Sequence, residues 1–229
     1  MDGFAEKFRR AFLEGDRWKL YFKGLGLTLE VALFAAILGL IIGTVLALLR
    51  TTKTRSGKNT IWSYLAGAYI DIIRGTPSVV QLLIMWFIIM KNSTNGVLVA
   101  SLSFGINSGA YVAEIVRAGI LAVDRGQTEA GRSLGLSKAQ TFLYIVLPQA
   151  IKNVLPPIGN EFIVLIKETA IVGYVSLSDL TRVANQVASR TYEAFFPLVG
   201  AAAIYFVIIK VLSILLGILE RRLRKSDHR

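Results

Sequence analysis

The stretch GQTEAGRSLGLSKAQTFLYIVLP, residues 126–148, decides how this chain of 229 residues is organised. Its first half is polar and its second half is apolar, so it connects a surface segment to a buried one. Thr128 can cap the start of a short helix, Glu129 would complement the helix dipole in the first turn, and Gly135 can supply the left-handed residue that ends it. The pattern predicts a short helix over residues 128–135.

The expected helix would present a small apolar face. Ala130 and Leu134 are spaced to lie on one side of a helix, with the charged Glu129 and Arg132 beside them. A short, capped helix with one apolar face is suited to bind in a groove on another protein. We therefore expect this segment to contact a partner.

The composition places the rest of the chain in a membrane. Hydrophobic residues make up 54% of the chain and charged residues 18%, the mean hydropathy is +0.56, and the formal net charge is +11. A basic chain would suggest nucleic acid as a partner, but long uncharged runs place the positive charges at the ends of membrane spans. The sequence predicts an all-α integral membrane protein that binds no nucleic acid.

Several kinds of chemistry are disfavoured by the residue types that the sequence lacks. There is no Cys, and the single His is His228, so neither thiolate nor paired-imidazole metal sites are expected. The nearest approach to a phosphate-binding loop, Gly57-Lys58, is followed by Asn59 instead of Ser or Thr. We expect no metal site, no catalytic residues, no cofactor and no ATP site on this chain.

Five apolar segments are long enough to cross a bilayer. They cover residues 25–49, 61–90, 97–121, 141–166 and 196–219, which together define a transmembrane domain over residues 25–219. Gly75 and Pro77 interrupt the second segment, which predicts a kinked span. Pro156 and Pro157 lie in the fourth segment and predict irregular backbone that protein or a cavity must cover.

The first 24 residues form a polar segment of their own. Phe4, Phe8 and Phe12 would lie on one helix face, which predicts an amphipathic lead-in over residues 1–24 that lies on the bilayer surface.

The distribution of basic residues predicts the orientation in the membrane. Thirteen Lys and Arg residues lie in segments 50–58 and 117–138 and in the basic tail, residues 220–229, against nine in the N-terminal segment and the remaining connections. The excess predicts a cytoplasmic C-terminus and, with five spans, an N-terminus outside.

Polar residues within the spans are costly and often functional. Asp71 with Arg74, and Glu114 with Arg117, are spaced to pair across one helix turn. Such pairs would bridge the helices of one bundle, and this structural role is the alternative to ligand contact.

Carboxylates and nearby amides predict a substrate pocket near the middle of the membrane. Asn160 and Glu161 follow the two prolines of the fourth segment, in the kind of interrupted helix on which transporter sites are built. Asn107 and Ser108 lie near the middle of the third segment. The predicted substrate-binding residues are Glu30, Asn107, Glu114, Asn160 and Glu161, and further candidates for substrate contact or gating are Gln81, Arg74 and Glu168. Carboxylates that face the path would favour a cationic ligand.

The spacing of Glu129-Ala130, Gly135, Ile145, Leu147 and Pro148 resembles the signature of permease subunits of ABC importers. That signature reads E-A-A, three residues, G, nine residues, I, any residue, L-P. Gly131 stands in place of the second Ala, which exchanges one small residue for another.

Other segments are similar to the subfamily that imports polar amino acids of the histidine, glutamine and arginine type. These are Gly119–Gln127, Arg74-Gly75-Thr76-Pro77 with Gln81, and Lys167-Glu168-Thr169. The likeness extends over roughly residues 20–220.

The resemblance implies the type I ABC importer permease fold, with five transmembrane helices and a short cytoplasmic coupling helix. It implies a transport subunit rather than an enzyme, with ATP and Mg bound by two copies of a separate ATPase subunit. Coupling to that ATPase would involve Glu129, Ala130, Gly131, Leu134 and Gly135.

The same resemblance implies further partners and a location. A second permease, either the same chain or a related one, would complete a twofold dimer, and an extracytoplasmic solute-binding protein would deliver the substrate. The expected location is a prokaryotic inner membrane, surrounded by lipid. The expected substrates are polar L-amino acids, with the basic Arg, Lys and His favoured by the carboxylates.

Two other classes of function are open on the residues alone. An ATP-independent secondary transporter of small polar solutes would equally use intramembrane carboxylates and broken helices, but it would leave the capped helix at residues 128–135 without a purpose. A membrane-embedded enzyme could use Glu and Asp pairs as acid and base, although the sequence offers few nucleophiles.

Overall fold

The computed structural model describes residues 3–52 and 58–225. Within these ranges every regular element is a helix, which confirms the all-α prediction. The middle of the predicted basic loop, residues 53–57, and the end of the basic tail, including His228, lie outside the described residues.

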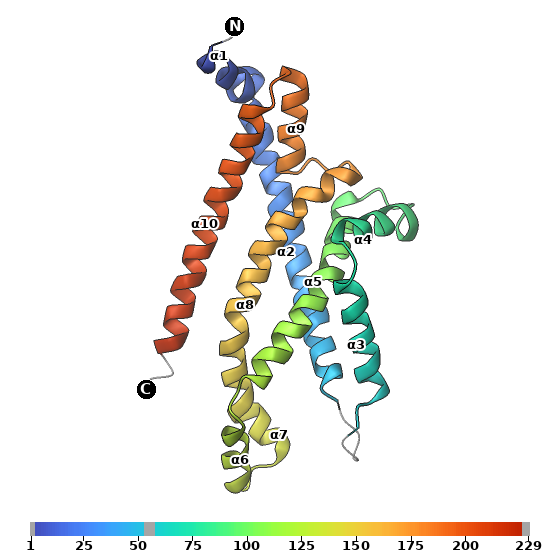
Figure 1. The fold of residues 1–229 in the computed structure, drawn as a ribbon, viewed down its shortest axis with the longest axis vertical. Coiled ribbons are helices and arrows are strands. Elements are labelled where there is room, and N and C mark those ends of the chain that lie inside the picture. Colours follow the sequence, from blue (N-terminus) through green and yellow to red (C-terminus); the bar gives the residue numbers. More distant parts are fainter. Residues whose placement is uncertain (1–2, 53–57, 226–229) are drawn as a thin grey trace. The chain divides into compact units, whose positions relative to one another are not determined.

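Figure 1 shows the helices in chain order. Their bounds are α1 (Phe4–Phe8), η1 (Arg9–Leu13), η2 (Glu14–Asp16), α2 (Arg17–Arg50), α3 (Ile61–Arg74), α4 (Ser78–Ile84), η3 (Met85–Ile89), α5 (Gly96–Leu121), α6 (Arg125–Ser133), α7 (Lys138–Thr141), η4 (Phe142–Val146), α8 (Leu147–Glu168), η5 (Thr169–Val175), α9 (Leu180–Thr191) and α10 (Phe195–Lys225). Of the η elements, η1, η3 and η4 are π-helical and η2 and η5 are 3-10 helices.

Three helical stretches of the described chain are long and apolar enough to cross a membrane. They are Phe4–Arg50, Gly96–Leu121 and Phe195–Leu223, and a fourth is added if the bent pair Ile61–Arg74 and Ser78–Ile89 forms one broken span. The two helices of this pair are bent by 103°. The predicted break is therefore confirmed, because Pro77, at the N-cap of α4, cannot donate the hydrogen bond that would continue α3.

The fourth predicted span differs from the expectation in its backbone. Pro156 and Pro157 lie inside the continuous helix α8, so the predicted irregular backbone at the two prolines is wrong. Neighbouring helices hold α8 closely on both sides of them, since Val154 packs on Gly119 and Leu216 packs on Gly159. Polar residues of α8, such as Glu161, keep it outside the three apolar stretches, so a crossing by this helix stays a prediction.

The chain forms two compact units. The first comprises Met1–Ala36, Pro77–Phe104 and Ile163–Ile214, and the second comprises Ile37–Thr76, Gly105–Phe162 and Leu215–Arg229. Each unit has its own core, and the long helices α2, α5, α8 and α10 each contribute to both.

The core of the first unit is built around α9. One face of this helix is buried against Tyr21 of α2 and Ala201 of α10 through Leu180, Val183, Ala184 and Val187. The buried carboxylate of Asp179 caps the helix by accepting hydrogen bonds from the backbone N–H groups of Thr181 (2.9 Å) and Arg182 (3.0 Å). Burial raises the pKa of Asp179, and these two hydrogen bonds oppose the rise.

The aromatic residues of the N-terminal segment contact protein. The ring of Phe4 meets Phe196 of α10 edge to face at 4.8 Å, and Phe12 packs on Gly200 of the same helix. Lys7 forms an ion pair with Glu193 at 2.8 Å. One side of the predicted lead-in is therefore covered by the start of α10, and its position on a bilayer stays a prediction.

Small residues bring α2 and α5 close together in the second unit. A Cβ atom added at Gly39 would lie 2.9 Å from Ser108, and one added at Gly43 would lie 2.5 Å from Val112. Such close contact between helices is typical of membrane bundles, where small residues let backbones approach.

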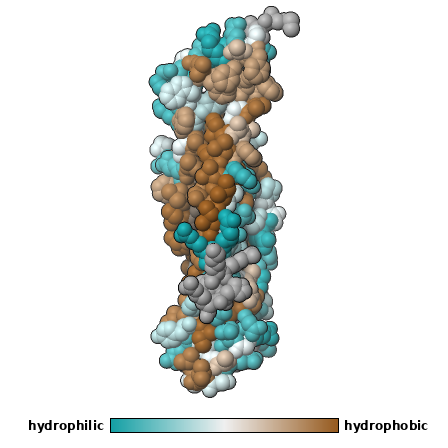
Figure 2. All heavy atoms as spheres, turned by 90° about the vertical axis from the view of Figure 1, so that its left-hand side faces the viewer, coloured by the Kyte–Doolittle hydropathy of each residue, from teal (hydrophilic) through white to brown (hydrophobic). Residues whose placement is uncertain are grey.

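The α10 helix is apolar on its outer face. Phe206, Val207 and Leu215 are each more than half exposed, and Figure 2 shows hydrophobic side chains gathered on this side of the chain. Exposed apolar surface on a long helix is expected where lipid is the solvent.

Candidate functional site

The first candidate site is the short helix α6, which is defined by its caps. It begins at Arg125, and Asp124 caps it by accepting a hydrogen bond from the N–H of Gly126 at 2.7 Å. The predicted start at Thr128 is therefore wrong, and Glu129 lies in the second turn. Asp124 and Thr128 are both residue types that cap helices, and in the structure Asp124 is the cap.

The predicted end of this helix is confirmed. Gly135 adopts the left-handed conformation, with a φ of 84°, and the N–H of Leu136 donates to the carbonyl oxygen of Gly131 at 3.2 Å. This pattern of backbone bonds ends a helix and favours glycine at the left-handed position.

The signature residues of the stretch form one joint. Gly131 is the buried residue of α6, and a Cβ atom there would lie 2.7 Å from Cδ1 of Ile145 and 2.8 Å from Cγ2 of Thr141. Ser137 and Gln140 form a reciprocal capping box at the start of α7, which fixes the chain between α6 and η4. The packing of Thr141 and Ile145 on Gly131 thus fixes the position of α6 relative to α7 and η4.

The outer face of α6 carries the other predicted coupling residues. Leu134 is 82% exposed, and Glu129 and Ala130 are also exposed. An exposed apolar side chain at the end of a capped helix is suited to fill a pocket on a partner protein.

The second candidate site joins α5 and α8. The hydroxyl of Ser108 donates a hydrogen bond to Oε1 of Glu161 at 2.8 Å. Ser108 is buried, Glu161 is half-buried, and both belong to the second unit. The described part of the chain supplies no ion-pair partner for Glu161, whose carboxylate accepts the hydrogen bond from Ser108.

The two predicted amide residues of this site differ in exposure. Asn107 is only 4% exposed and makes an interaction within the chain. Asn160 is exposed on α8 next to Glu161. The structure thus brings Glu161 to Ser108, and it leaves Asn160 accessible beside them.

The carboxylate of Glu114 forms ion pairs with two arginines. Its Oε2 accepts a hydrogen bond from Nη2 of Arg117 at 2.6 Å, and Nη1 of Arg50 lies 3.6 Å from its Oε1. The predicted pairing with Arg117 is present, and Arg50 is a second partner that the sequence did not indicate because it lies on another helix. These contacts favour the structural role of Glu114 over a ligand contact.

Arg74 also has an aromatic neighbour. Its guanidinium lies over the ring of Tyr111, 5.2 Å from the centroid. The sequence predicted that Arg74 would pair with Asp71 instead.

The remaining predicted residues belong to the first unit. Glu30 is exposed on α2, whereas Gln81 on α4 and Glu168 at the end of α8 are half-buried and each interact within the chain.

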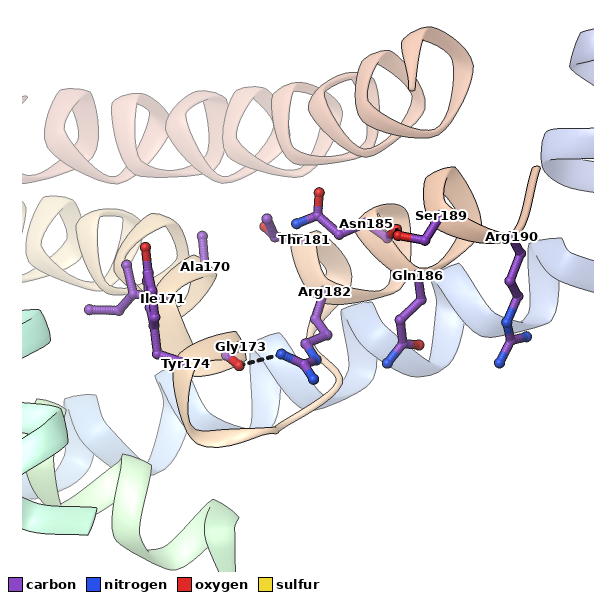
Figure 3. Close-up of a pocket in the computed structure, with 10 residues that line it drawn as sticks. All are labelled: Ala170, Ile171, Gly173, Tyr174, Thr181, Arg182, Asn185, Gln186, Ser189 and Arg190. Carbon is purple, nitrogen blue, oxygen red and sulfur yellow. Dashed lines mark hydrogen bonds between the residues drawn. The ribbon is translucent and has the colours of Figure 1, made fainter. Parts of the chain in front are cut away.

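A large hollow of the first unit is lined by none of the predicted residues. It has a volume of about 910 Å³ and lies beside the polar face of α9, where Arg182, Gln186 and Arg190 line it (Figure 3). Nη1 of Arg182 donates to the carbonyl oxygen of Gly173 at 2.6 Å, which ties α9 to η5.

Comparison with known proteins identifies the family. The sequence pattern of the family described as binding-protein-dependent transport system inner membrane component matches residues 39–225. The chain is 39% identical over 208 residues to the arginine transport system permease protein ArtQ of Bacillus subtilis, covering 90% of this chain and 93% of that one. It is 35% identical over 215 residues to the glutamine transport system permease protein GlnP of Escherichia coli, covering 90% and 97%.

A solved structure has the same fold. The chain in the crystal structure of an amino acid ABC transporter with histidines superposes with a TM-score of 0.82 and 44% identity, covering 89% of this chain and 94% of that chain. This chain therefore belongs to the family of inner-membrane components of binding-protein-dependent transport systems, and it has the type I ABC importer permease fold.

Family membership decides between the classes left open by the residues. The chain is a multi-pass membrane permease subunit of an ABC importer, whose ATPase is on a separate chain and which works with a substrate-binding protein. The alternatives of an ATP-independent transporter and a membrane enzyme are set aside.

Proposed function

We propose that this permease forms the path for L-amino acids and prefers the basic ones, Arg, Lys and His. The observation that carries the preference is the half-buried carboxylate of Glu161, which is held by the neutral hydroxyl of Ser108 and has no ion-pair partner in the described chain. A carboxylate in a low-dielectric site attracts a cation more strongly than it would in water. The arginine and glutamine permeases among the relatives support amino acids as the substrate class.

We assign the substrate contacts to two groups of residues. Glu161 and the neighbouring Asn160 and Asn107 are the primary group, and Glu30 would add negative charge along the path. Gln81, Arg74 and Glu168 are candidates for gating. Glu114 is the weakest of the predicted ligands, because Arg117 and Arg50 already engage its carboxylate.

Coupling to the ATPase is assigned to α6. The exposed Glu129, Ala130 and Leu134 would dock on the ATPase, and Gly131 and Gly135 would fix the helix relative to η4. Two ATPase subunits, which bind ATP and Mg, would each receive one α6 from a permease dimer, and we favour a homodimer. Closure of the ATPases would bias the permease between two conformations.

The proposed topology has five crossings, with α8 as the fourth, the N-terminus outside and the C-terminus in the cytoplasm. It places α6 in the cytoplasm, where the ATPase would be. The support is the excess of basic residues in the segments 50–58, 117–138 and 220–229.

The experiment is uptake of labelled Arg, Lys and His by the reconstituted permease, ATPase and binding protein. Glu161→Gln should lower uptake of all three by at least about tenfold, equivalent to about 1.4 kcal/mol. Unchanged uptake of every basic amino acid would show that Glu161 is not a substrate contact.

A further inference from the structure

A second polar cavity lies where α2 ends and α3 begins. Its volume is about 520 Å³, within the range of small-molecule sites. Its lining includes Arg50, Asn59, Tyr64, Gly67, Asp71 and Arg117, all from the second unit. Glu161 is not among the residues that line it.

The end of α2 and the start of α3 build the cavity. Thr60 caps α3, and the hydroxyl of Ser63 donates to the carbonyl oxygen of Arg50 at 2.8 Å, which ties the start of one helix to the end of the other. Gly67 leaves room beside Arg50: an added Cβ would meet only the Arg50 guanidinium, at 3.6 Å. A larger side chain at this position would therefore fill the cavity.

The basic side of the cavity has a donor without an acceptor. Nη1 of Arg50 is buried and makes no hydrogen bond within the described chain, although Glu114 lies 3.6 Å away. Buried donors are nearly always hydrogen-bonded, so this atom indicates a missing acceptor. Arg117 supplies a second guanidinium to the lining, and since its Nε and Nη2 donate to Glu114, Nη1 is the atom that can meet a ligand.

The lining also carries the opposite charge. Asp71 of α3 faces the same cavity as the two arginines. Guanidinium groups bind carboxylates, and a carboxylate binds an ammonium group. The cavity thus offers both kinds of partner that a zwitterion needs, and Tyr64 and Asn59 offer neutral polar groups beside them.

We propose that this cavity binds a free α-amino acid, with its carboxylate on Arg50 and Arg117 and its ammonium group on Asp71. The inference rests on the proposed function, because the proposed orientation places this end of α2, α3 and α5 in the cytoplasm, on the same side of the membrane as α6. The ligand is then the imported amino acid after its release. By bridging the three helices it favours one conformation and slows further import.

The test uses the full transporter in proteoliposomes, with ATP inside and with binding protein and labelled L-arginine outside. Unlabelled L-arginine at increasing concentration in the lumen should slow the initial uptake rate. N-acetyl-L-arginine, which lacks the ammonium group, should inhibit at least tenfold less effectively.

Two matched variants separate the cavity from a general effect. Gly67→Leu fills the cavity and should raise the lumenal concentration for half-inhibition at least tenfold, measured relative to the same variant with an empty lumen. Gly217→Leu makes the same change on α10, where an added Cβ would meet no atom of another part of the described chain within 4 Å, and it should keep the native inhibition. Asp71→Asn should weaken inhibition by L-arginine.

Each outcome decides the inference. Equal inhibition of native and Gly67→Leu transporters, or uptake by the native transporter that no lumenal arginine slows, overturns the cavity site and leaves the proposed function intact. Absence of any arginine uptake by the native transporter overturns the proposed function, and the inference falls with it.

Discussion

The α carbon of Gly131 is packed directly against the side chain of Ile145, so closely that a Cβ atom would lie 2.7 Å from Cδ1. These two residues belong to one sequence signature, and their contact explains its spacing. The helix α6 ends, the chain turns at Gly135, and η4 returns to cover the small residue. The signature therefore encodes a packed joint, and we propose that this joint transmits movement of α6 to the rest of the permease.

A series at Gly131 tests the joint. Gly131→Ala should keep ATPase stimulation, because the flexible end of Ile145 can move and alanine favours the helix by about 0.5–1 kcal/mol. Gly131→Leu should displace α6 and lower the stimulation at least about tenfold while the permease stays in the membrane. ATPase activity of the purified complex measures both, and full stimulation of the Leu variant would refute a tightly packed joint.

The exposed face of α6 gives a second prediction. Leu134→Ala removes an 82% exposed apolar side chain, and it should weaken binding of the ATPase by about 1–2 kcal/mol if Leu134 fills a pocket there. Glu129→Lys should abolish substrate-dependent ATP hydrolysis. Co-purification and ATPase assays measure these effects, and Leu143→Ala, at an exposed residue of η4, is the matched control. Normal coupling in both α6 variants would rule out this docking face.

Substitution of Ser108 should perturb the proposed substrate site less than substitution of Glu161. Ser108→Ala removes the hydrogen bond that positions the carboxylate, which should raise the KM for arginine severalfold, since such a bond contributes about 1 kcal/mol. Ser101→Ala is the control, because the buried hydroxyl of Ser101 has no hydrogen-bond partner in the described chain. A KM equal in the native and Ser108→Ala transporters would separate Ser108 from substrate binding.

The ion pair of Lys7 and Glu193 predicts a pH dependence of stability. The hydrogen bond from Lys7, followed by the one from the N–H of Phe195, lowers the pKa of Glu193. A carboxyl whose pKa is lower when folded stabilises the fold above its ordinary pKa, and this contribution is lost as the pH falls through the folded value. The native chain should therefore have a higher Tm than Glu193→Gln at neutral pH, and the difference should shrink progressively as the pH falls below the ordinary Glu pKa of about 4.3. Thermal unfolding in detergent measures it, and a difference that does not change with pH would contradict the prediction.

Local features of the sequence predicted much of the fold. Gly135 was identified as the end of α6 because a left-handed residue there favours glycine, and Pro77 marked the break between α3 and α4. The start of α6 was misplaced because Asp124 and Thr128 are both suitable caps. The expectation for Pro156 and Pro157 failed because contacts from Gly119 and Leu216, distant in sequence, hold α8.

In the candidate site, too, local sequence predicted some features, whereas contacts between distant residues could not be predicted. Glu161 was predicted from its place among prolines and amides, but its contact with Ser108 depends on how α5 crosses α8. The pairing of Glu114 with Arg117 follows from helical spacing, whereas the second partner, Arg50, comes from the end of another helix. Long-range contacts of this kind leave no periodic signal in one sequence.

The most direct test of the central proposal is equilibrium binding of labelled L-arginine to the purified permease and ATPase complex without the binding protein. We predict saturable binding that Lys and His compete for more effectively than Gln, and that Glu161→Gln weakens at least about tenfold. Absence of binding by the native complex, or equal competition by Gln and Lys, would contradict a selective site on this chain.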